Sequence, residues 1–175
     1  MPDTSIPIRS RPGLRLVVMG VAGCGKSAVG ERLATALGVP LVEGDSFHPP
    51  ANIAKMREGK ALDDADRAGW LAVLGEQLAD RPEGAVLTCS ALKAAYRQRL
   101  RAAAPELRFV HLSLTPAQAL ARVASRQDHF YPPSLVDSQF AALEDPRGEP
   151  GVVSLDASQP MDVVVERALQ ALRAA

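Results

Sequence analysis

Eight residues near the start of the chain fit the pattern G-x-x-x-x-G-K-[ST] at every specified position: Gly20-Val21-Ala22-Gly23-Cys24-Gly25-Lys26-Ser27. Glycines let backbone N–H groups curl around phosphate oxygens, and a helix that follows adds its positive N-terminal end. Lys26 would neutralise the β and γ phosphates, and the Ser27 hydroxyl would bind Mg²⁺. We therefore predict that all eight residues bind a nucleoside triphosphate; a chance match in a glycine-rich turn is the alternative.

Two absences in the sequence narrow the class of nucleotide-binding protein. GTPases, motor ATPases and transport ATPases share this loop with kinases. The chain has no N-K-x-D motif for guanine, and its third expected strand ends in Thr88-Cys89-Ser90 instead of the Asp with which hydrolytic ATPases support magnesium. Both observations favour a small-molecule kinase that uses ATP and Mg²⁺.

A carboxylate follows the second expected strand. Asp45 lies at the C-terminal edge of an open parallel sheet, where ligands bind and where the phosphate loop also lies. Phosphoryl transfer to a hydroxyl needs a group that orients the acceptor and takes its proton, and a carboxylate can do both. We predict this catalytic role for Asp45, with a helix or turn cap as the alternative. Glu43, on the same strand face, is either a support for magnesium through water or a solvated acid.

Short apolar runs alternate with segments of helical periodicity along the chain. The expected strands are 14–19, 39–42, 85–89, 109–112 and 152–155. The expected helices cover 27–37, 70–78, 92–100, 120–123 and 164–172. Thr115, Pro116 and Gln118 carry the start signal of the fourth helix, including a capping box. The alternation predicts an α/β fold of three layers, α/β/α, with a five-stranded parallel sheet covered by helices on both faces.

Two regions do not fit simple connections between strands and helices. One is rich in Pro, Gly and charge, and the other joins charge to aromatic residues and prolines. We interpret them as a substrate flap over about 46–66 and a lid over about 125–133, because loops of this kind on an α/β scaffold usually carry function. Residues 1–13 are expected to be a flexible tail, and 14–175 a single domain.

Composition excludes several kinds of partner. The chain has 175 residues with 20 Lys+Arg and 20 Asp+Glu, so no general field draws it to nucleic acid or to a membrane surface. The sequence shows neither a signal peptide nor an apolar stretch long enough for a membrane helix. Cys24 and Cys89 are far apart and form no metal or disulfide pattern, which favours small buried thiols in a reducing cytoplasm.

Further stretches of the chain resemble the gluconate kinase family, and the matches run from about Gly20 to Pro146. The matching residues are Gly44-Asp45-Ser46-Phe47-His48-Pro49, Asn52, Lys55-Met56, Gly59, Leu62, Asp64, Asp66-Arg67, Trp70, Cys89-Ser90-Ala91-Leu92-Lys93, Tyr96-Arg97, Arg126, His129-Phe130, Ser138-Gln139-Phe140, Leu143-Glu144 and Pro146. The resemblance implies transfer of phosphate from ATP to gluconate, giving 6-phosphogluconate, on a P-loop kinase fold with strand order 2-3-1-4-5, commonly as a homodimer. Gln127-Asp128 departs from the more basic, glycine-containing lid of that family.

Gluconate is a carboxylate with many hydroxyls, so its site should combine a cation with neutral hydrogen-bonding groups. The candidate cations are Arg67, Lys93 and Arg97, and the candidate hydroxyl partners are His48, Ser90 and His129. Solvated surface charges and loop-packing histidines are the alternatives. Trp70, the only tryptophan, is expected in the core.

Arg122 and Arg126 are four residues apart and share one helix face. By the resemblance, Arg126 closes onto the transferred phosphate and Arg122 packs near adenine; a solvated helix face is the alternative. Two other functions stay open at this point. One is a kinase of shikimate, another sugar acid or a nucleotide, and the other is a non-catalytic nucleotide-binding regulator.

Overall fold

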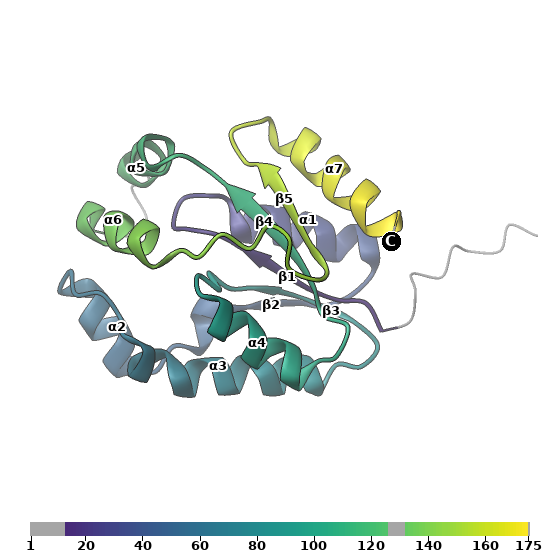
Figure 1. Cartoon of the computed structure of the whole chain (residues 1–175), viewed down its shortest axis with the longest axis horizontal. Helices are drawn as coiled ribbons and strands as arrows, with labels where there is room; N and C mark the ends of the chain where they lie inside the picture. The colour runs from purple at the N-terminus through teal and green to yellow at the C-terminus, as the bar shows by residue number, and fades with distance from the viewer. Residues whose placement is uncertain (1–12, 126–131, 175) are drawn as a thin grey trace, which may run out of the picture.

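Five parallel strands form one sheet in the order β2-β3-β1-β4-β5, as expected (Figure 1). The computed structural model describes residues 13–125 and 132–174. The strands are β1 Arg15–Met19, β2 Leu41–Glu43, β3 Ala85–Thr88, β4 Arg108–Ser113 and β5 Val152–Asp156. In the register of the central strands, Val17 lies between Leu87 and Phe109. The buried residues of the central strands β1, β3 and β4 are mostly apolar, because both faces of these strands are covered.

Helices cover both faces of the sheet. Their bounds are α1 Lys26–Leu37, η1 Gly44–Phe47, α2 Pro50–Arg57, α3 Asp64–Ala79, α4 Ala94–Ala103, α5 Pro116–Ser125, α6 Pro133–Ala142 and α7 Met161–Arg173, η1 being a 3₁₀ helix. In Figure 1, α3 and α4 lie below the sheet, and α7 lies on the other side, where it packs with α1 in the same half of the core. The three-layer α/β/α architecture is confirmed.

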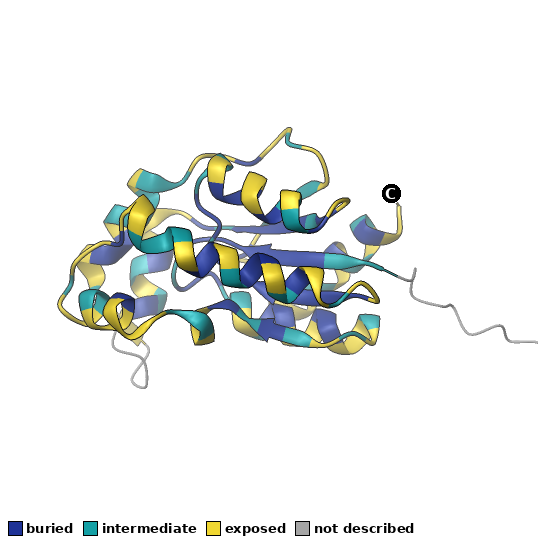
Figure 2. Cartoon of the chain, turned by 90° about the horizontal axis from the view of Figure 1, so that it is seen from below, coloured by how far each residue is buried: buried dark blue, intermediate teal, exposed yellow. Residues whose placement is uncertain are grey.

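The core has two halves because successive residues of a strand point to opposite faces. From β1, Leu16 and Val18 pack with α1, α5 and α7, whereas Val17 and Met19 pack with α3 and α4. Trp70 belongs to the second half and is 2% exposed, which confirms its expected place in the core. In Figure 2 the helices turn dark blue, buried faces toward the sheet and yellow, exposed faces outward.

Capping boxes start two of the helices. The one predicted for α5 is present: Thr115 Oγ1 accepts from the Gln118 N–H at 3.2 Å, and Gln118 Oε1 accepts from the Thr115 N–H at 2.9 Å. A second box, not predicted, joins Asp63 and Asp66 at the start of α3. Such reciprocal bonds satisfy backbone donors that the helix leaves free. They fix where both helices begin: α3 starts at the end of the expected flap, and α5 is the helix that leads to the expected lid.

The expected flap contains regular structure. Residues 46–66 include the end of η1, all of α2 and the start of α3, and α2 lacks the apolar stripe that periodicity would detect, since only Asn52 among its residues is buried. Helix α6 was likewise not predicted. Arg126, His129 and most of the expected lid lie outside the described residues, as does the expected tail except for Gly13.

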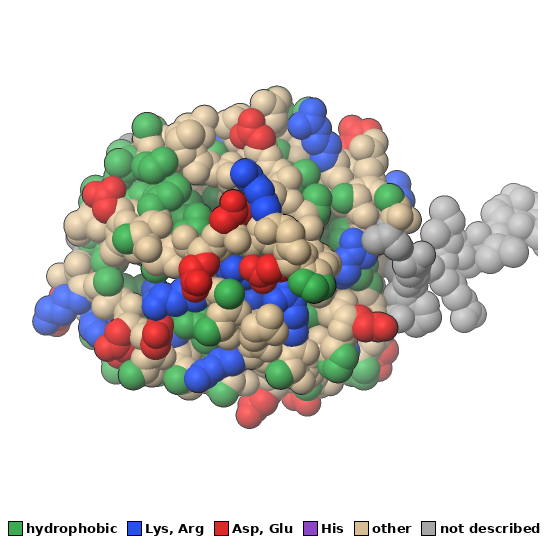
Figure 3. Space-filling view, viewed as in Figure 1, with side chains coloured by type: hydrophobic (Ala, Val, Ile, Leu, Met, Phe, Trp, Pro, Cys, Tyr) green, Lys and Arg blue, Asp and Glu red, His purple; other side chains and the backbone are tan. Residues whose placement is uncertain are grey.

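Charges of both signs are spread over the molecule. On the face seen in Figure 3, acidic and basic side chains are interspersed. Among the described residues, no helix is both long enough and apolar enough to cross a membrane.

Candidate active site

The loop between β1 and α1 has the backbone geometry that phosphate binding needs. Gly20, Gly23 and Gly25 have φ values of 148°, 83° and 95°, a region that favours glycine. A Cβ on Gly20 would lie 2.7 Å from the carbonyl oxygen of Leu112, so no larger residue fits there. Helix α1 begins directly after Gly25, and no side chain caps it. Its first N–H groups and its dipole are therefore available to an anion.

Two groups of this loop donate hydrogen bonds to other groups of the protein. Lys26 Nζ donates to the carbonyl oxygens of Gly20 at 3.0 Å and Val21 at 3.1 Å. The N–H of Ala22 donates to Oε1 of Gln139 on α6, at 2.6 Å. This second contact links the phosphate loop to a helix 117 residues later in the chain. Gln139 belongs to a stretch that matches the gluconate kinase family, but its role in the site was not predicted, because the sequence does not show that α6 lies against the phosphate loop.

Beside the loop, three side chains form a chain of oxygen atoms. Glu43 Oε2 accepts from Ser27 Oγ at 3.1 Å and from Thr88 Oγ1 at 2.6 Å. Thr88 Oγ1 in turn accepts from the N–H of Gly44 at 3.2 Å. Carboxylate and hydroxyl oxygens are the ligands that Mg²⁺ prefers. The donor set at the end of β2 and β3 therefore fits that ion.

A pocket of about 490 Å³ adjoins the loop. Its walls come from the phosphate loop, the end of β2, η1, α2, α3 and α6. The predicted site residues that line it are Ala22, Gly23, Gly25, Lys26, Ser27, Asp45, His48, Arg67 and Ser90. The structure thus brings the predicted nucleotide side and most of the predicted acceptor side into one cavity.

Asp45 and His48 lie together on the acceptor side. The Asp45 side chain is 84% exposed, and its Oδ1 is 3.7 Å from Nε2 of His48. The His48 ring stacks on Trp70 with centroids 4.1 Å apart, and Trp70 Nε1 donates to the Gly44 carbonyl at 2.8 Å. Burial lowers the pKa of His48, Asp45 opposes this and Arg67 adds to it. The neutral imidazole is therefore favoured.

The pocket holds more positive charge than sequence reasoning assigned to it. Arg57 at the end of α2 and Lys60 just after it line the pocket together with Arg67. Apolar groups, among them Ile53 of α2 and Leu135 of α6, line it as well. The sequence shows these basic residues in the flap. It did not show that they line the pocket, because their position depends on α2, a helix that was not predicted.

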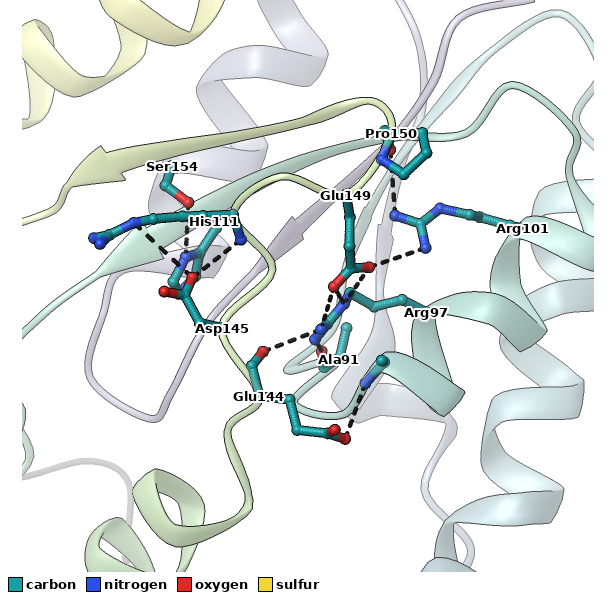
Figure 4. A network of polar contacts seen from close by, with 11 residues as sticks. Ala91, Arg97, Arg101, His111, Glu144, Asp145, Glu149, Pro150 and Ser154 are labelled. Atoms are coloured by element: carbon teal, nitrogen blue, oxygen red, sulfur yellow. Dashed lines mark hydrogen bonds and ion pairs between the residues drawn. The ribbon is translucent and has the colours of Figure 1, made fainter.

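Arg97 lies outside this pocket, in a buried network (Figure 4). Its side chain is fully buried, and it donates to the carbonyl oxygens of Ala91 at 2.7 Å and Glu144 at 3.0 Å and to the carboxylate of Glu149. Hydrogen bonds from Arg97, the largest effect, hold the pKa of Glu149 below its usual range. All three guanidinium nitrogens are thus occupied. The substrate-binding role predicted for Arg97 is withdrawn.

Lys93 is also not brought to the pocket. Its Nζ pairs with Asp64 Oδ1 at 2.9 Å and lies 5.7 Å from the centre of the Tyr96 ring. The Tyr96 hydroxyl donates to the same carboxylate, and this bond, followed by that from Lys93, lowers the pKa of Asp64. Lys93 therefore ties the start of α4 to the start of α3.

Arg122 bridges the phosphate loop and the loop after β5. Its guanidinium donates to the carbonyl oxygens of Gly23 at 3.3 Å, Cys24 at 3.4 Å and Ala157. Cys24 and Cys89 are both free and buried, and burial raises the pKa of Cys89 to about 12, so this thiol stays protonated. The described residues contain no cluster of three or more His, Cys, Asp or Glu side chains suited to a metal ion.

The sheet order and the pocket that joins a phosphate loop to a carboxylate define a P-loop kinase. A family model described as an AAA domain matches residues 16–148. The gluconokinase of Gluconobacter oxydans (strain 621H) is 44% identical over 162 residues, which cover 91% of each chain. The thermosensitive gluconokinase of Escherichia coli (strain K12) is 37% identical over 93% of this chain and 89% of its own. The chain belongs to the gluconokinase family.

Solved structures agree with this assignment. The crystal structure of a gluconokinase from Sinorhizobium meliloti 1021 has a TM-score of 0.87 and 49% identity, over 93% of both chains. A deoxyadenosine kinase from M. mycoides, at 13% identity and a TM-score of 0.68, shares the fold alone.

Proposed function

We propose that the protein transfers the terminal phosphoryl group of ATP to the 6-hydroxyl of D-gluconate, giving 6-phospho-D-gluconate and ADP. One observation carries the proposal: a single pocket is lined both by Lys26 and Ser27 of the phosphate loop and by the carboxylate of Asp45. Relatives that are named gluconokinases and align over about nine tenths of the chain support gluconate as the acceptor.

In this proposal Asp45 orients the acceptor hydroxyl and takes its proton as the oxygen bonds to phosphorus. Its exposed side chain suits that task, because the hydroxyl can reach it from the pocket. Arg67 binds the carboxylate of the substrate, with Arg57 and Lys60 as further cations in the same pocket. His48 and Ser90 bind hydroxyl groups of the sugar acid.

The eight residues from Gly20 to Ser27 hold the nucleotide phosphates, with Lys26 neutralising their charge. Ser27 binds Mg²⁺, and Glu43 supports it through water; the oxygen atoms that meet at Glu43 fit this assignment. The ion would neutralise charge on the phosphates. Arg122 keeps its proposed place near the adenine, and its contact with Ala157, just after β5, is compatible with that place. Arg126 and His129 stay predictions from the family resemblance.

Assembly and location rest on the same resemblance. We propose a homodimer in the cytoplasm, the flap at about 46–66 closing over the sugar acid and the lid at about 125–133 over the phosphates. The two free, buried thiols are compatible with a reducing compartment. Light scattering after size-exclusion chromatography tests the dimer directly, and a monomeric mass at micromolar concentration would exclude it.

A coupled assay of ADP release tests the reaction and the substrate together. With ATP and Mg²⁺, gluconate is expected to give robust turnover, whereas shikimate and neighbouring sugar acids are expected to give little. Turnover of shikimate without turnover of gluconate would replace the proposed substrate. ATP binding without phosphorylation of any small acid would instead favour a nucleotide-binding regulator.

A further inference from the structure

The His48 ring lies between a carboxylate and a carboxamide. Its Nε2 atom is 3.7 Å from Asp45 Oδ1, and its Nδ1 atom is 3.3 Å from Nδ2 of Asn52. Stacking on Trp70, with an interplanar angle of 15°, fixes the plane of the ring. The side chain of His48 is only 6% exposed, so water does not replace these partners freely. Each ring nitrogen therefore has a definite neighbour.

A backbone carbonyl decides the orientation of the Asn52 carboxamide. Nδ2 of Asn52 is 3.0 Å from the carbonyl oxygen of Asp66, which can only accept a hydrogen bond. The opposite orientation would place two acceptors against each other. Asn52 is 3% exposed, and a buried, mispaired amide is costly. The NH₂ end of Asn52 therefore faces both Asp66 and His48.

This orientation determines the tautomer of His48. Because Asn52 presents a donor, Nδ1 of His48 has to accept, and the proton of the neutral ring is on Nε2. That N–H is the one on the side of Asp45. A proton on Nδ1 would set two donors against each other at 3.3 Å.

We propose that Asn52 is a positioning residue, which holds His48 as the neutral Nε2–H tautomer so that a ring N–H faces Asp45 in the acceptor pocket. At 3.7 Å the donor and the carboxylate are slightly beyond a direct hydrogen bond. A small shift of either one, or an acceptor hydroxyl between them, completes the contact. The N–H then fixes the direction of the carboxylate that takes the proton. Only this last step rests on the proposed function.

The groups around His48 come from three elements. Asp45 on η1 faces Nε2, Asn52 on α2 faces Nδ1, and Arg67 and Trp70 come from α3. Burial and Arg67 lower the pKa of His48 and outweigh the opposing effect of Asp45. The ring therefore acts as a neutral donor at neutral pH, and Asp45 remains the base.

Nitrogen-15 NMR of the full chain tests the tautomer without any substrate. Long-range proton–nitrogen spectra at pH 7.5 distinguish the two neutral tautomers and the imidazolium. The chain has three histidines, and the signals absent from His48→Gln identify His48. The Nε2–H tautomer is expected. An Nδ1–H tautomer or an imidazolium would overturn the inference, whether or not gluconate is the substrate.

The variant Asn52→Asp tests the role in catalysis, because it replaces the donor by an acceptor of the same shape. His48 is expected to take a proton on Nδ1, and kcat with gluconate to fall at least about ten-fold, as for other groups that orient a reacting residue. The KM for ATP is expected to stay unchanged, and the acid limb of the pH–rate profile to move upward. An unchanged tautomer with unchanged kcat would refute the proposal.

Lys55→Met is the matched control on the same helix. Lys55 pairs with the carboxylate of Asp66 but does not contact His48, so its loss loosens α2 without changing the tautomer. We expect Lys55→Met to keep the wild-type ring signals and most of the activity. An equal loss of kcat in both variants would show that Asn52 acts only by holding α2 in place, and the proposal would be wrong.

Discussion

Two carboxylates at the end of β2 have different surroundings, and this difference separates their proposed roles. Glu43 is held by the hydroxyls of Ser27 and Thr88, next to the phosphate loop. Asp45 is largely exposed, lines the pocket and has the His48 ring beside it. A restrained carboxylate suits an ion, and an accessible one suits a reacting hydroxyl.

Replacing Asp45 by Asn tests its role as the base. The amide keeps the shape but cannot take a proton, so kcat is expected to fall about 10²- to 10⁴-fold. The Kd for ATP should not change, because Asp45 does not belong to the phosphate loop. Calorimetry for ATP and the coupled assay for turnover make the comparison. Near-normal turnover would remove Asp45 from the mechanism.

Replacing Glu43 by Gln tests the support of magnesium. The loss of charge beside Ser27 is expected to raise the Mg²⁺ concentration for half-maximal rate by about ten-fold or more. The KM for gluconate should change little, because the affected oxygen faces the phosphate loop. A magnesium titration at saturating ATP and gluconate measures this. An unchanged magnesium requirement would assign Glu43 a purely structural role.

The residues that the sequence identified are those with a local signature. Lys26 and Ser27 belong to a contiguous motif, and Asp45 follows a strand whose end has a known function. Gln139 and Asn52 lie in stretches that match the family, but no role was predicted for them, since their roles arise from contacts between elements that are separate in sequence. Arg97 was misassigned for the same reason: its partners, Glu144 and Glu149, are about 50 residues away.

At the scale of elements, strong periodicity predicted the strands and the long helices, whereas α2 and α6 were missed. Both begin at a proline position, are at most 10 residues long and have a weak apolar stripe. Helices of this length get their stability from tertiary packing more than from their own sequence. Single-sequence periodicity therefore cannot detect them, although they form two walls of the pocket.

The junction of β2 and η1 is tightly packed at Gly44. A Cβ there would lie 2.1 Å from the backbone oxygen of Thr88, so Gly44→Ala is expected to destabilise the fold by about 3 kcal/mol or more. Gly69 in the exposed middle of α3 has nothing within 4 Å of an added Cβ. Gly69→Ala should stabilise the protein by about 0.5 to 1 kcal/mol. Urea unfolding of the two variants measures both changes in the free energy of unfolding. A similar change in the two variants would contradict the prediction.

At the scale of the whole molecule, His111 makes stability depend on pH. It lies in β4, with Nδ1 3.0 Å from Ser154 Oγ, and burial lowers its pKa from 6.5 to about 4. Between these values the unfolded chain binds more protons than the folded one, so stability falls as pH falls from about 6.5 to 4. The expected loss between pH 7.5 and pH 5 is about 2 kcal/mol.

Urea unfolding at several pH values measures this loss. In His111→Gln, the free energy of unfolding is expected to depend much less on pH than in the wild type, whatever the stability of the variant at pH 7.5. His48, whose pKa is also lowered, contributes in the same range, so His48→Gln is the comparison. The ion pair of Glu149 acts in a separate pH range. The lowered pKa of its carboxyl adds stability at neutral pH, and this stability is lost only as the pH falls below about 4.5. Equal slopes in His111→Gln and wild type would contradict the assignment.

The buried guanidinium of Arg97 also anchors the C-terminal end of α6. It donates to the carbonyl of Glu144, just after α6 ends at Ala142, so this end of the helix is tied to α4. The same helix carries Gln139, whose Oε1 accepts from the N–H of Ala22 in the phosphate loop. A buried ion pair outside the pocket is therefore connected to the nucleotide side of the site through a single short helix.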